Sequence, residues 1–216
     1  MSNLLKTKSS VIKALYQLMY DFDRILESNE LEYWMDGGTY LGAIRHKGII
    51  PWDDDVDVAM EYKNRNKLLD LTSQFKKCGY IIIKTWFGYK ICYKDKKLVV
   101  GEKYSFPNLD VFLYKKIKNV YIPAFKKVRE IWPNAYYNEY EVYPLKKYLF
   151  GETKIYGICQ YKDYFDRMYG KDWNKVAYRQ YDHQKEEEVV SVKVKLTKKD
   201  RIPAEPTKVV KRKCAN

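Results

Sequence analysis

The sequence predicts an α+β fold in which helices flank a mixed β-sheet. A long amphipathic helical pattern opens the chain, and short runs of β-branched and aromatic residues follow it, separated by glycine and proline. No internal repeat and no low-complexity linker divides the 216 residues, which suffice for one sizeable hydrophobic core. We therefore expect a helix over residues 1–29 that packs on a core domain at 30–185, followed by a basic tail at 186–216.

The first predicted element is the amphipathic helix. Apolar side chains recur at three- and four-residue steps, at Val11, Leu15, Leu18, Phe22 and Ile25. This spacing predicts a helix from about residue 4 to residue 28, with its apolar stripe packed against a sheet.

Short elements follow around a glycine pair. Residues 31–35 are typical of a strand, and Gly37-Gly38 forms a tight turn after it. We expect a second helix over residues 39–45. Pro51 cannot continue a helix and precedes the predicted strand at 56–60.

The remaining predicted elements have either the periodicity of a helix or that of a strand. Residues 64–78 have helical spacing, and residues 80–93 read as a hairpin that passes through Gly88. A further strand is predicted at 109–114. Residues 163–169 form a short helix that Gly170 ends, and the alternating valines at 190–196 indicate one exposed strand.

The formal net charge of +13 suggests a polyanionic partner, such as nucleic acid, an acidic membrane surface or a phosphorylated substrate. The charge is uneven, because residues 191–216 hold nine Lys or Arg against two acidic residues. A short basic tail is most often a solvated segment, and we expect this one to be in part disordered.

The cysteines and the hydropathy indicate the cellular compartment in which we expect the protein. Four scattered cysteines without a Cys-x-x-Cys pair suggest reduced thiols rather than a disulfide frame or a zinc site. No apolar run has the length of a membrane span, and the N-terminus lacks the apolar core of a signal peptide. We therefore expect a cytoplasmic protein.

Four carboxylates fall within five positions, at Asp53, Asp54, Asp55 and Asp57. Crowded like charges cost stability unless a cation or a proton compensates them. Alternate residues of a strand share a face, so Asp53, Asp55 and Asp57 can point the same way. Such carboxylates suit Mg²⁺, which prefers a few carboxylates together with substrate phosphate oxygens.

The spacing of the acidic run also matches the start of an EF-hand calcium loop. That loop requires Gly and Glu where the chain has Val58 and Asn64, so we reject it. Trp52 and the apolar residues interleaved after Asp55 argue against a solvated acidic turn. The acidic run could also form a structural cluster of salt bridges with residues 45–47, and this alternative stays open.

The glycine pair offers a second functional feature. Unencumbered N–H groups at a turn before a helix can bind phosphate near the positive end of the helix dipole. A Gly-Gly pair alone is more often a plain turn.

Residues 33–48 and 50–57 together closely resemble the LicD family, which includes bacterial phosphocholine transferases and the fukutin and fukutin-related ribitol-phosphate transferases. The resemblance extends from about residue 30 to residue 183. Its later blocks are Leu109-Asp110-Val111-Phe112, Tyr143-Pro144-Leu145-Lys146-Lys147 with Phe150-Gly151, and Tyr169-Gly170-Lys171-Asp172-Trp173.

This resemblance implies a nucleotidyltransferase-like catalytic domain over residues 30–185 and a set of metal ligands. Asp55 and Asp57 would hold Mg²⁺ or Mn²⁺, with Asp53 and Asp36 as auxiliary candidates. Asp110 would be the third carboxylate, acting as a ligand or as general base on the acceptor hydroxyl.

The resemblance also implies a site for the donor. Gly37, Gly38 and Thr39 would bind its phosphates. The basic residues Arg45, His46 and Lys47 would neutralise charge that develops on the leaving nucleotide. The simpler alternative is that basic residues at a helix end merely complement its dipole.

The implied function is Mg²⁺-dependent transfer of a phospho-alcohol, such as phosphocholine or ribitol phosphate, from a CDP-type donor to a glycan hydroxyl. The setting would be lipopolysaccharide or glycoprotein biosynthesis. Partners would be the nucleotide-diphosphate-activated donor and the glycan, without nucleic acid. One alternative is a nucleotidyltransferase that moves NMP from an NTP, and another is a non-catalytic, basic nucleic-acid-binding protein.

Overall fold

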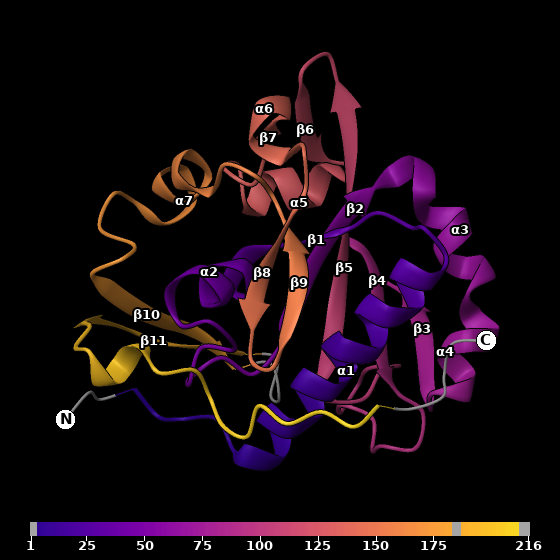
Figure 1. The fold of residues 1–216 in the computed structure, drawn as a ribbon, viewed down its shortest axis with the longest axis horizontal. Coiled ribbons are helices and arrows are strands. Elements are labelled where there is room, and N and C mark those ends of the chain that lie inside the picture. Colours follow the sequence, from indigo (N-terminus) through magenta and orange to yellow (C-terminus); the bar gives the residue numbers. More distant parts are fainter. Residues whose placement is uncertain (1–3, 183–186, 212–216) are drawn as a thin grey trace.

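A computed structural model describes residues 4–182 and 187–211, and its centre is a seven-stranded mixed sheet (Figure 1). The order of its main strands is β1-β2-β5-β4-β3, and β6 and β7 extend it from β5. β2 and β5 pair in parallel and the other neighbours pair antiparallel. The strands are β1 (Trp34–Met35), β2 (Val56–Glu61), β3 (Tyr80–Lys84), β4 (Gly88–Tyr93), β5 (Asn108–Ile117), β6 (Val120–Pro123) and β7 (Tyr137–Asn138). The predicted α+β class with a mixed sheet is confirmed.

Helix α1 (Ser9–Ser28) lies across one face of the sheet, in front of β5 in Figure 1. Its predicted apolar stripe is buried, and the Tyr93 hydroxyl of β4 donates to the Ala14 carbonyl at 2.8 Å. The helix begins five residues later than predicted. Before it, the Thr7 N–H donates to the Pro51 carbonyl at 2.8 Å, so the chain lies against another loop instead of continuing the helix.

Helix α2 (Gly37–Arg45) begins at Gly37 rather than at the predicted Thr39. Asp36 is its N-cap, and an Asp36 carboxylate oxygen accepts from the Gly37 N–H at 2.7 Å. The glycine pair is therefore the first turn of the helix, not a separate turn before it.

The helix predicted over residues 64–78 is divided into shorter pieces. These are the 3₁₀ turn η1 (Tyr62–Asn64), α3 (Arg65–Asp70) and α4 (Thr72–Lys77). The break falls at Leu71, and the Thr72 hydroxyl donates to the Leu69 carbonyl at 2.6 Å. Thr side chains compete in this way for helical carbonyls, which the apolar spacing alone does not reveal.

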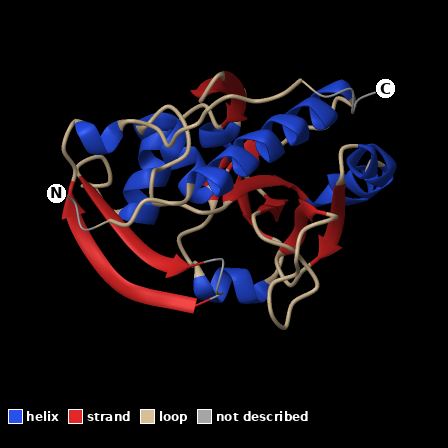
Figure 2. Cartoon of the chain, turned by 90° about the horizontal axis from the view of Figure 1, so that it is seen from below, coloured by secondary structure: helices blue, strands red, loops and turns tan. Residues whose placement is uncertain are grey.

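Two hairpins accompany the central sheet, one formed by β8 and β9 and the other by β10 and β11. Figure 2 shows β10 and β11 as a pair of long strands at one side of the molecule. The remaining elements are α5 (Lys126–Ile131), α6 (Glu139–Val142), β8 (Lys146–Phe150), β9 (Thr153–Gly157), α7 (Tyr161–Tyr169), β10 (Val176–Asp182), β11 (Glu187–Lys195) and η2 (Lys199–Arg201).

Residues 196–211, within the predicted basic tail, contact the rest of the chain. The Ala204 N–H donates to the Ile49 carbonyl at 2.9 Å. The Gln17 side chain of α1 donates to the Val210 carbonyl at 2.9 Å and accepts from its N–H at 2.7 Å. The final segment thus adds hydrogen bonds to α1 and to the loop after α2.

Two findings bear on the predicted compartment. Cys92 and Cys159 are buried free thiols, but Cys78 is disulfide-bonded, so the expectation of four reduced thiols is wrong at Cys78. Sequence spacing does not reveal which cysteines meet in space. Within the described ranges, no helix is both long and apolar enough to cross a bilayer.

Candidate active site

Three carboxylates converge where β2 begins. The parallel register of β2 and β5 places Asp57 directly opposite Asp110. Asp55 precedes β2 by one residue, and one oxygen from each of these three side chains lies within 4.8 Å of the others. We call Asp55, Asp57 and Asp110 the carboxylate cluster. Sequence reasoning selected all three, and the structure brings them together.

The loop that precedes β2, which we call the acidic loop, holds a second acidic group. Oxygens of Asp53, Asp54 and Asp55 also lie within 4.8 Å of one another, so Asp55 belongs to both groups. Asp54, Asp55 and Asp110 are buried. Removing several like charges from water is unfavourable unless a cation compensates them. An all-oxygen donor set of this kind fits a hard divalent cation.

The N-terminus of α2 touches these carboxylates through its two glycines. A Cβ atom on Gly37 would lie 2.9 Å from Asp57 Oδ2, and one on Gly38 would lie 2.8 Å from Asp53 Oδ2. Gly37 also has a φ of +49°, which disfavours other residues. The glycines thus permit a close approach of the α2 backbone to Asp57 and Asp53.

Thr39 fixes the position of α2 relative to β2. Its Oγ1 accepts a hydrogen bond of 2.7 Å from the Asp57 backbone N–H. Thr39 is buried, so the bond is shielded from water. The predicted phosphate-binding residue therefore also positions a carboxylate of the cluster.

Asp36, which we expected as an auxiliary metal ligand, is instead held by protein donors. It is buried and accepts from the hydroxyls of Tyr164 at 2.7 Å, Tyr114 at 3.1 Å, and Tyr137. Burial, followed by the Asp36 charge, raises the pKa of Tyr137 and Tyr164 well above the ordinary value. Together with the Gly37 N–H, four groups donate hydrogen bonds to the Asp36 carboxylate, and these bonds give it a structural role.

Lys90 is a residue of the site that sequence reasoning missed. The antiparallel register of β4 and β5 places it opposite Asp110. Its Nζ lies 2.8 and 2.9 Å from the two Asp110 oxygens and 2.9 Å from Asn108 Oδ1. The side chain is buried. The sequence did contain a signal for Lys90, because it is a lysine inside the apolar run Gly88–Tyr93. Buried lysines are rarely without a charged partner.

The three basic residues at the end of α2 lie in different surroundings. Arg45 is buried and donates to the carbonyls of Trp173 at 2.6 Å and Val176 at 2.9 Å. Burial lowers its pKa to about 10, so it keeps its charge at neutral pH. Burial also lowers the pKa of His46 to about 3, so this imidazole is neutral and supplies no positive charge. Lys47 is exposed and donates to the Ile44 carbonyl.

Tyr169 lies within electrostatic reach of the acidic loop. Burial raises its pKa well above the ordinary value, and the charges of Asp36, Asp57 and Asp53 raise it further. It is the first residue of the Tyr-Gly-x-x-Trp block that we singled out from the sequence. The structure thus brings this distant block near the start of β2.

Aromatic rings extend from the carboxylate cluster along the sheet. Phe112 lies two residues after Asp110 on β5 and therefore shares its face. Phe87 stacks on Phe112 at 4.7 Å, Trp132 meets Phe112 edge-on at 5.9 Å, and Trp86 stacks on Trp132 at 6.1 Å. Trp86 and Trp132 are 42% and 40% exposed. We call these four aromatic residues the aromatic shelf.

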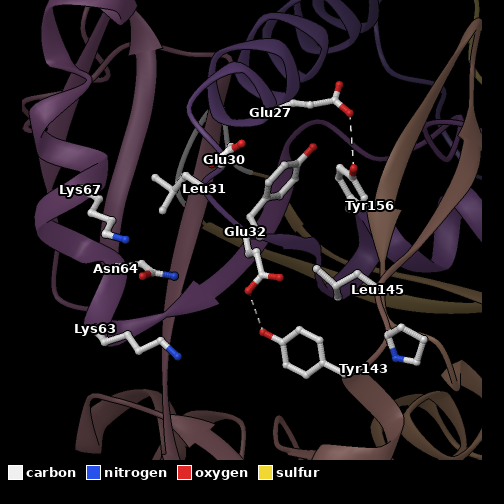
Figure 3. A pocket seen from close by; sticks show the side chains of 12 residues that line it. Glu27, Glu30, Leu31, Glu32, Lys63, Asn64, Lys67, Tyr143, Leu145 and Tyr156 are labelled. Atoms are coloured by element: carbon white, nitrogen blue, oxygen red, sulfur yellow. Dashed lines mark hydrogen bonds between the residues drawn. The ribbon is translucent and has the colours of Figure 1, made fainter.

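A separate groove lies beyond the opposite end of β2, with a volume of about 710 Å³. Figure 3 shows Lys63 and Lys67 on one side and Tyr143 and Tyr156 on the other. The Tyr143 hydroxyl donates to Glu32 at 3.4 Å across this space (Figure 3). None of the carboxylate cluster lines the groove, so we do not place the reaction there.

The chain is similar in sequence to several known proteins. The chain is 35% identical over 164 residues to protein RP689 of Rickettsia prowazekii, covering 76% of this chain and 56% of that protein. It is 45% identical over 53 residues to the lipopolysaccharide cholinephosphotransferase LicD of Haemophilus influenzae, covering 24% of this chain and 20% of that protein. It is 53% identical over 36 residues to the mouse ribitol 5-phosphate transferase FKRP, covering 17% and 7%.

The chain spans about half the length of the curated relatives that it matches over most of its own length. The family described as LicD/FKTN/FKRP, nucleotidyltransferase domain, matches residues 30–157, which include every residue of the carboxylate cluster together with Gly37 and Gly38. The chain therefore belongs to the LicD family.

Proposed function

We propose that this protein transfers a phospho-alcohol from a CDP-type donor to a glycan hydroxyl, with Mg²⁺ or Mn²⁺ as cofactor. The observation that carries the proposal is the convergence of Asp55, Asp57 and Asp110 within 4.8 Å, beside the N-terminus of α2. Its family supports phosphotransferase chemistry, since a relative in that family is a cholinephosphotransferase.

The carboxylate cluster would hold the divalent cation. When bound, such an ion neutralises charge on phosphoryl oxygens and orients them for displacement. Asp55 and Asp57 are the proposed principal ligands, and Asp53 is an additional candidate. Asp110 either completes the ligand set or accepts the proton of the acceptor hydroxyl. An Asp110 oxygen lies within 4.8 Å of the other two carboxylates, and both Asp110 oxygens also contact the Lys90 ammonium.

Donor and acceptor would approach from two sides of the cluster. The backbone N–H of Gly38 would donate a hydrogen bond to the donor phosphates at the positive end of α2, whereas that of Gly37 already donates to Asp36. Lys47 is exposed just past the C-terminal end of this helix, and it is a candidate to bind an oxygen of the donor that extends beyond the helix. The aromatic shelf gives the apolar face of a sugar ring a surface on which to stack.

Product analysis tests the reaction. The protein is incubated with Mg²⁺, CDP-choline, CDP-ribitol or CDP-glycerol and candidate glycans, and the release of CMP is measured. We expect CMP release with one donor and a fall in kcat of roughly 100-fold or more for Asp57→Asn. Asp95→Asn, an exposed change in the β4–β5 connection, is the matched control and should leave the rate unchanged. Release of pyrophosphate from an NTP instead would favour the nucleotidyltransferase alternative, and salt-sensitive DNA binding without nucleotide binding would favour the nucleic-acid binder.

The shelf gives a second test. Trp86→Ala removes an exposed stacking surface at the far end of the shelf, so the KM for the glycan should rise roughly 3- to 10-fold while kcat stays similar. Trp86→Phe keeps a ring and should restore most of the affinity. An unchanged KM in the alanine variant, measured with saturating donor, would remove the shelf from the acceptor site.

A further inference from the structure

We infer that the buried Lys90 ammonium takes the place of a second divalent cation, so that the carboxylate cluster binds one metal ion and not two. The inference rests on the metal site of the proposed function and adds its stoichiometry. It concerns a residue of β4 that lies outside the acidic loop and outside α2.

Lys90 makes the contacts that are expected of a cation held in a buried binding site. Its Nζ is 2.8 Å from Asp110 Oδ1, 2.9 Å from Asp110 Oδ2 and 2.9 Å from Asn108 Oδ1. An ammonium group has three N–H donors, and three acceptors surround it here. The side chains of Lys90 and Asp110 are 6% and 8% exposed. Lys90 is thus committed to the cluster rather than extended toward a substrate phosphate.

Aromatic rings hold the ammonium in that position. The Tyr104 ring lies 4.6 Å from Nζ and the Phe87 ring 5.6 Å from it, both within the range of cation–π attraction. Tyr104 and Phe87 are themselves buried. Moving Lys90 away would break the pair with Asp110 and leave that carboxylate buried without its ammonium.

The contacts of Asp110 then limit the cluster to one divalent ion. Asp110 is already paired with the Lys90 ammonium, so a divalent cation would bind on the side of Asp55 and Asp57. In sites with two ions, shared carboxylates bridge cations roughly 3.5–4 Å apart. Here both oxygens of Asp110 already contact an ammonium, which would repel a second ion bound to the same carboxylate.

Titration of the whole protein with Mn²⁺ tests the inference, with calorimetry and the electron paramagnetic resonance signal of free Mn²⁺ as readouts. Wild type should bind one equivalent at the carboxylate cluster. Lys90→Met keeps the length of the side chain but removes its charge, and should bind two equivalents. Lys84→Met removes an exposed charge from the end of β3 and should retain one equivalent.

The outcomes separate the inference from the proposed function. Two equivalents in wild type would overturn the role of Lys90 while supporting the metal site. One equivalent of unchanged affinity in a folded Lys90→Met variant would also overturn it. No binding in wild type would refute the metal site itself, and the inference with it. Because the wild-type stoichiometry needs no variant, the test stands even if Lys90→Met does not fold.

Discussion

At the scale of single residues, the buried carboxylates near α2 are compensated by different partners. Asp36 is surrounded by tyrosine hydroxyls, whereas Asp110 is paired with the Lys90 ammonium. Sequence spacing identified Asp55, Asp57 and Asp110 as a group, because an alternating acidic pattern and the family resemblance both mark them. It could not assign Lys90 to Asp110, because that pairing depends on the register of β4 against β5.

Asp23 supplies a pH-dependent contribution to stability away from the site. Burial raises its pKa from 3.8 to about 6, and the Tyr33 hydroxyl donates to it. The folded state therefore binds this proton more tightly than the unfolded state does. The stabilisation is full below about pH 4 and is lost as the pH rises through 6, by an amount up to about 3 kcal/mol.

Asp23→Asn tests this contribution. The amide is neutral at every pH, and its oxygen can still accept from Tyr33. We expect the free energy of unfolding of the variant, relative to wild type, to increase by up to about 3 kcal/mol between about pH 4 and pH 7. Urea denaturation at both pH values measures it. A difference between the two proteins that does not change with pH would contradict the raised pKa.

At the scale of elements, the placement of α2 determines the geometry of the site. Asp36 caps the helix, Gly37 and Gly38 contact the acidic loop, and the Thr39 hydroxyl oxygen accepts from the Asp57 N–H. The predicted order of a strand followed by a helix was right about this region, but the predicted turn at Gly37-Gly38 belongs to the helix. The prediction placed the start of the helix two residues late, because the spacing of apolar residues does not show that Asp36 is the cap.

Gly37→Ala and Gly79→Ala separate backbone strain from contact with the site. Both glycines have positive φ, +49° and +85°, so each alanine should destabilise the fold by about 1–2 kcal/mol. A Cβ at residue 79 meets no atom within 4 Å, whereas one at residue 37 would lie 2.9 Å from Asp57 Oδ2. Gly37→Ala should therefore displace that carboxylate and weaken Mn²⁺ binding by roughly tenfold or more. Equal Mn²⁺ affinity in the two variants, measured by calorimetry, would show that the close approach is unimportant.

Elements with strong periodicity were predicted well, and irregular ones were not. The α1 stripe, the β3–β4 hairpin and the helix ended by Gly170 follow from local pattern, and the structure contains all three. The break at Leu71 and the aromatic shelf depend on tertiary contacts. The shelf in particular joins rings from β5, the β3–β4 turn and the end of α5, which are distant in sequence.

At the scale of the whole molecule, net charge is a poor guide to the site. The chain carries +13, yet its candidate site is built from carboxylates. Residues 191–216 hold nine Lys or Arg against two acidic residues. Within this stretch, residues 196–211 contact α1 and the loop after α2 through Gln17–Val210 and Ala204–Ile49 hydrogen bonds. Composition describes surface charge, whereas the site depends on strand order and register.

Anomalous diffraction from a crystal soaked in Mn²⁺ would locate the bound ion. The structure offers two acidic groups that share Asp55, and we expect the ion at the one that includes Asp57 and Asp110. A single anomalous peak should lie about 2.1 Å from oxygens of Asp55 and Asp57. A peak held by Asp53 and Asp54 instead, or no peak at these carboxylates at saturating Mn²⁺, would contradict this expectation.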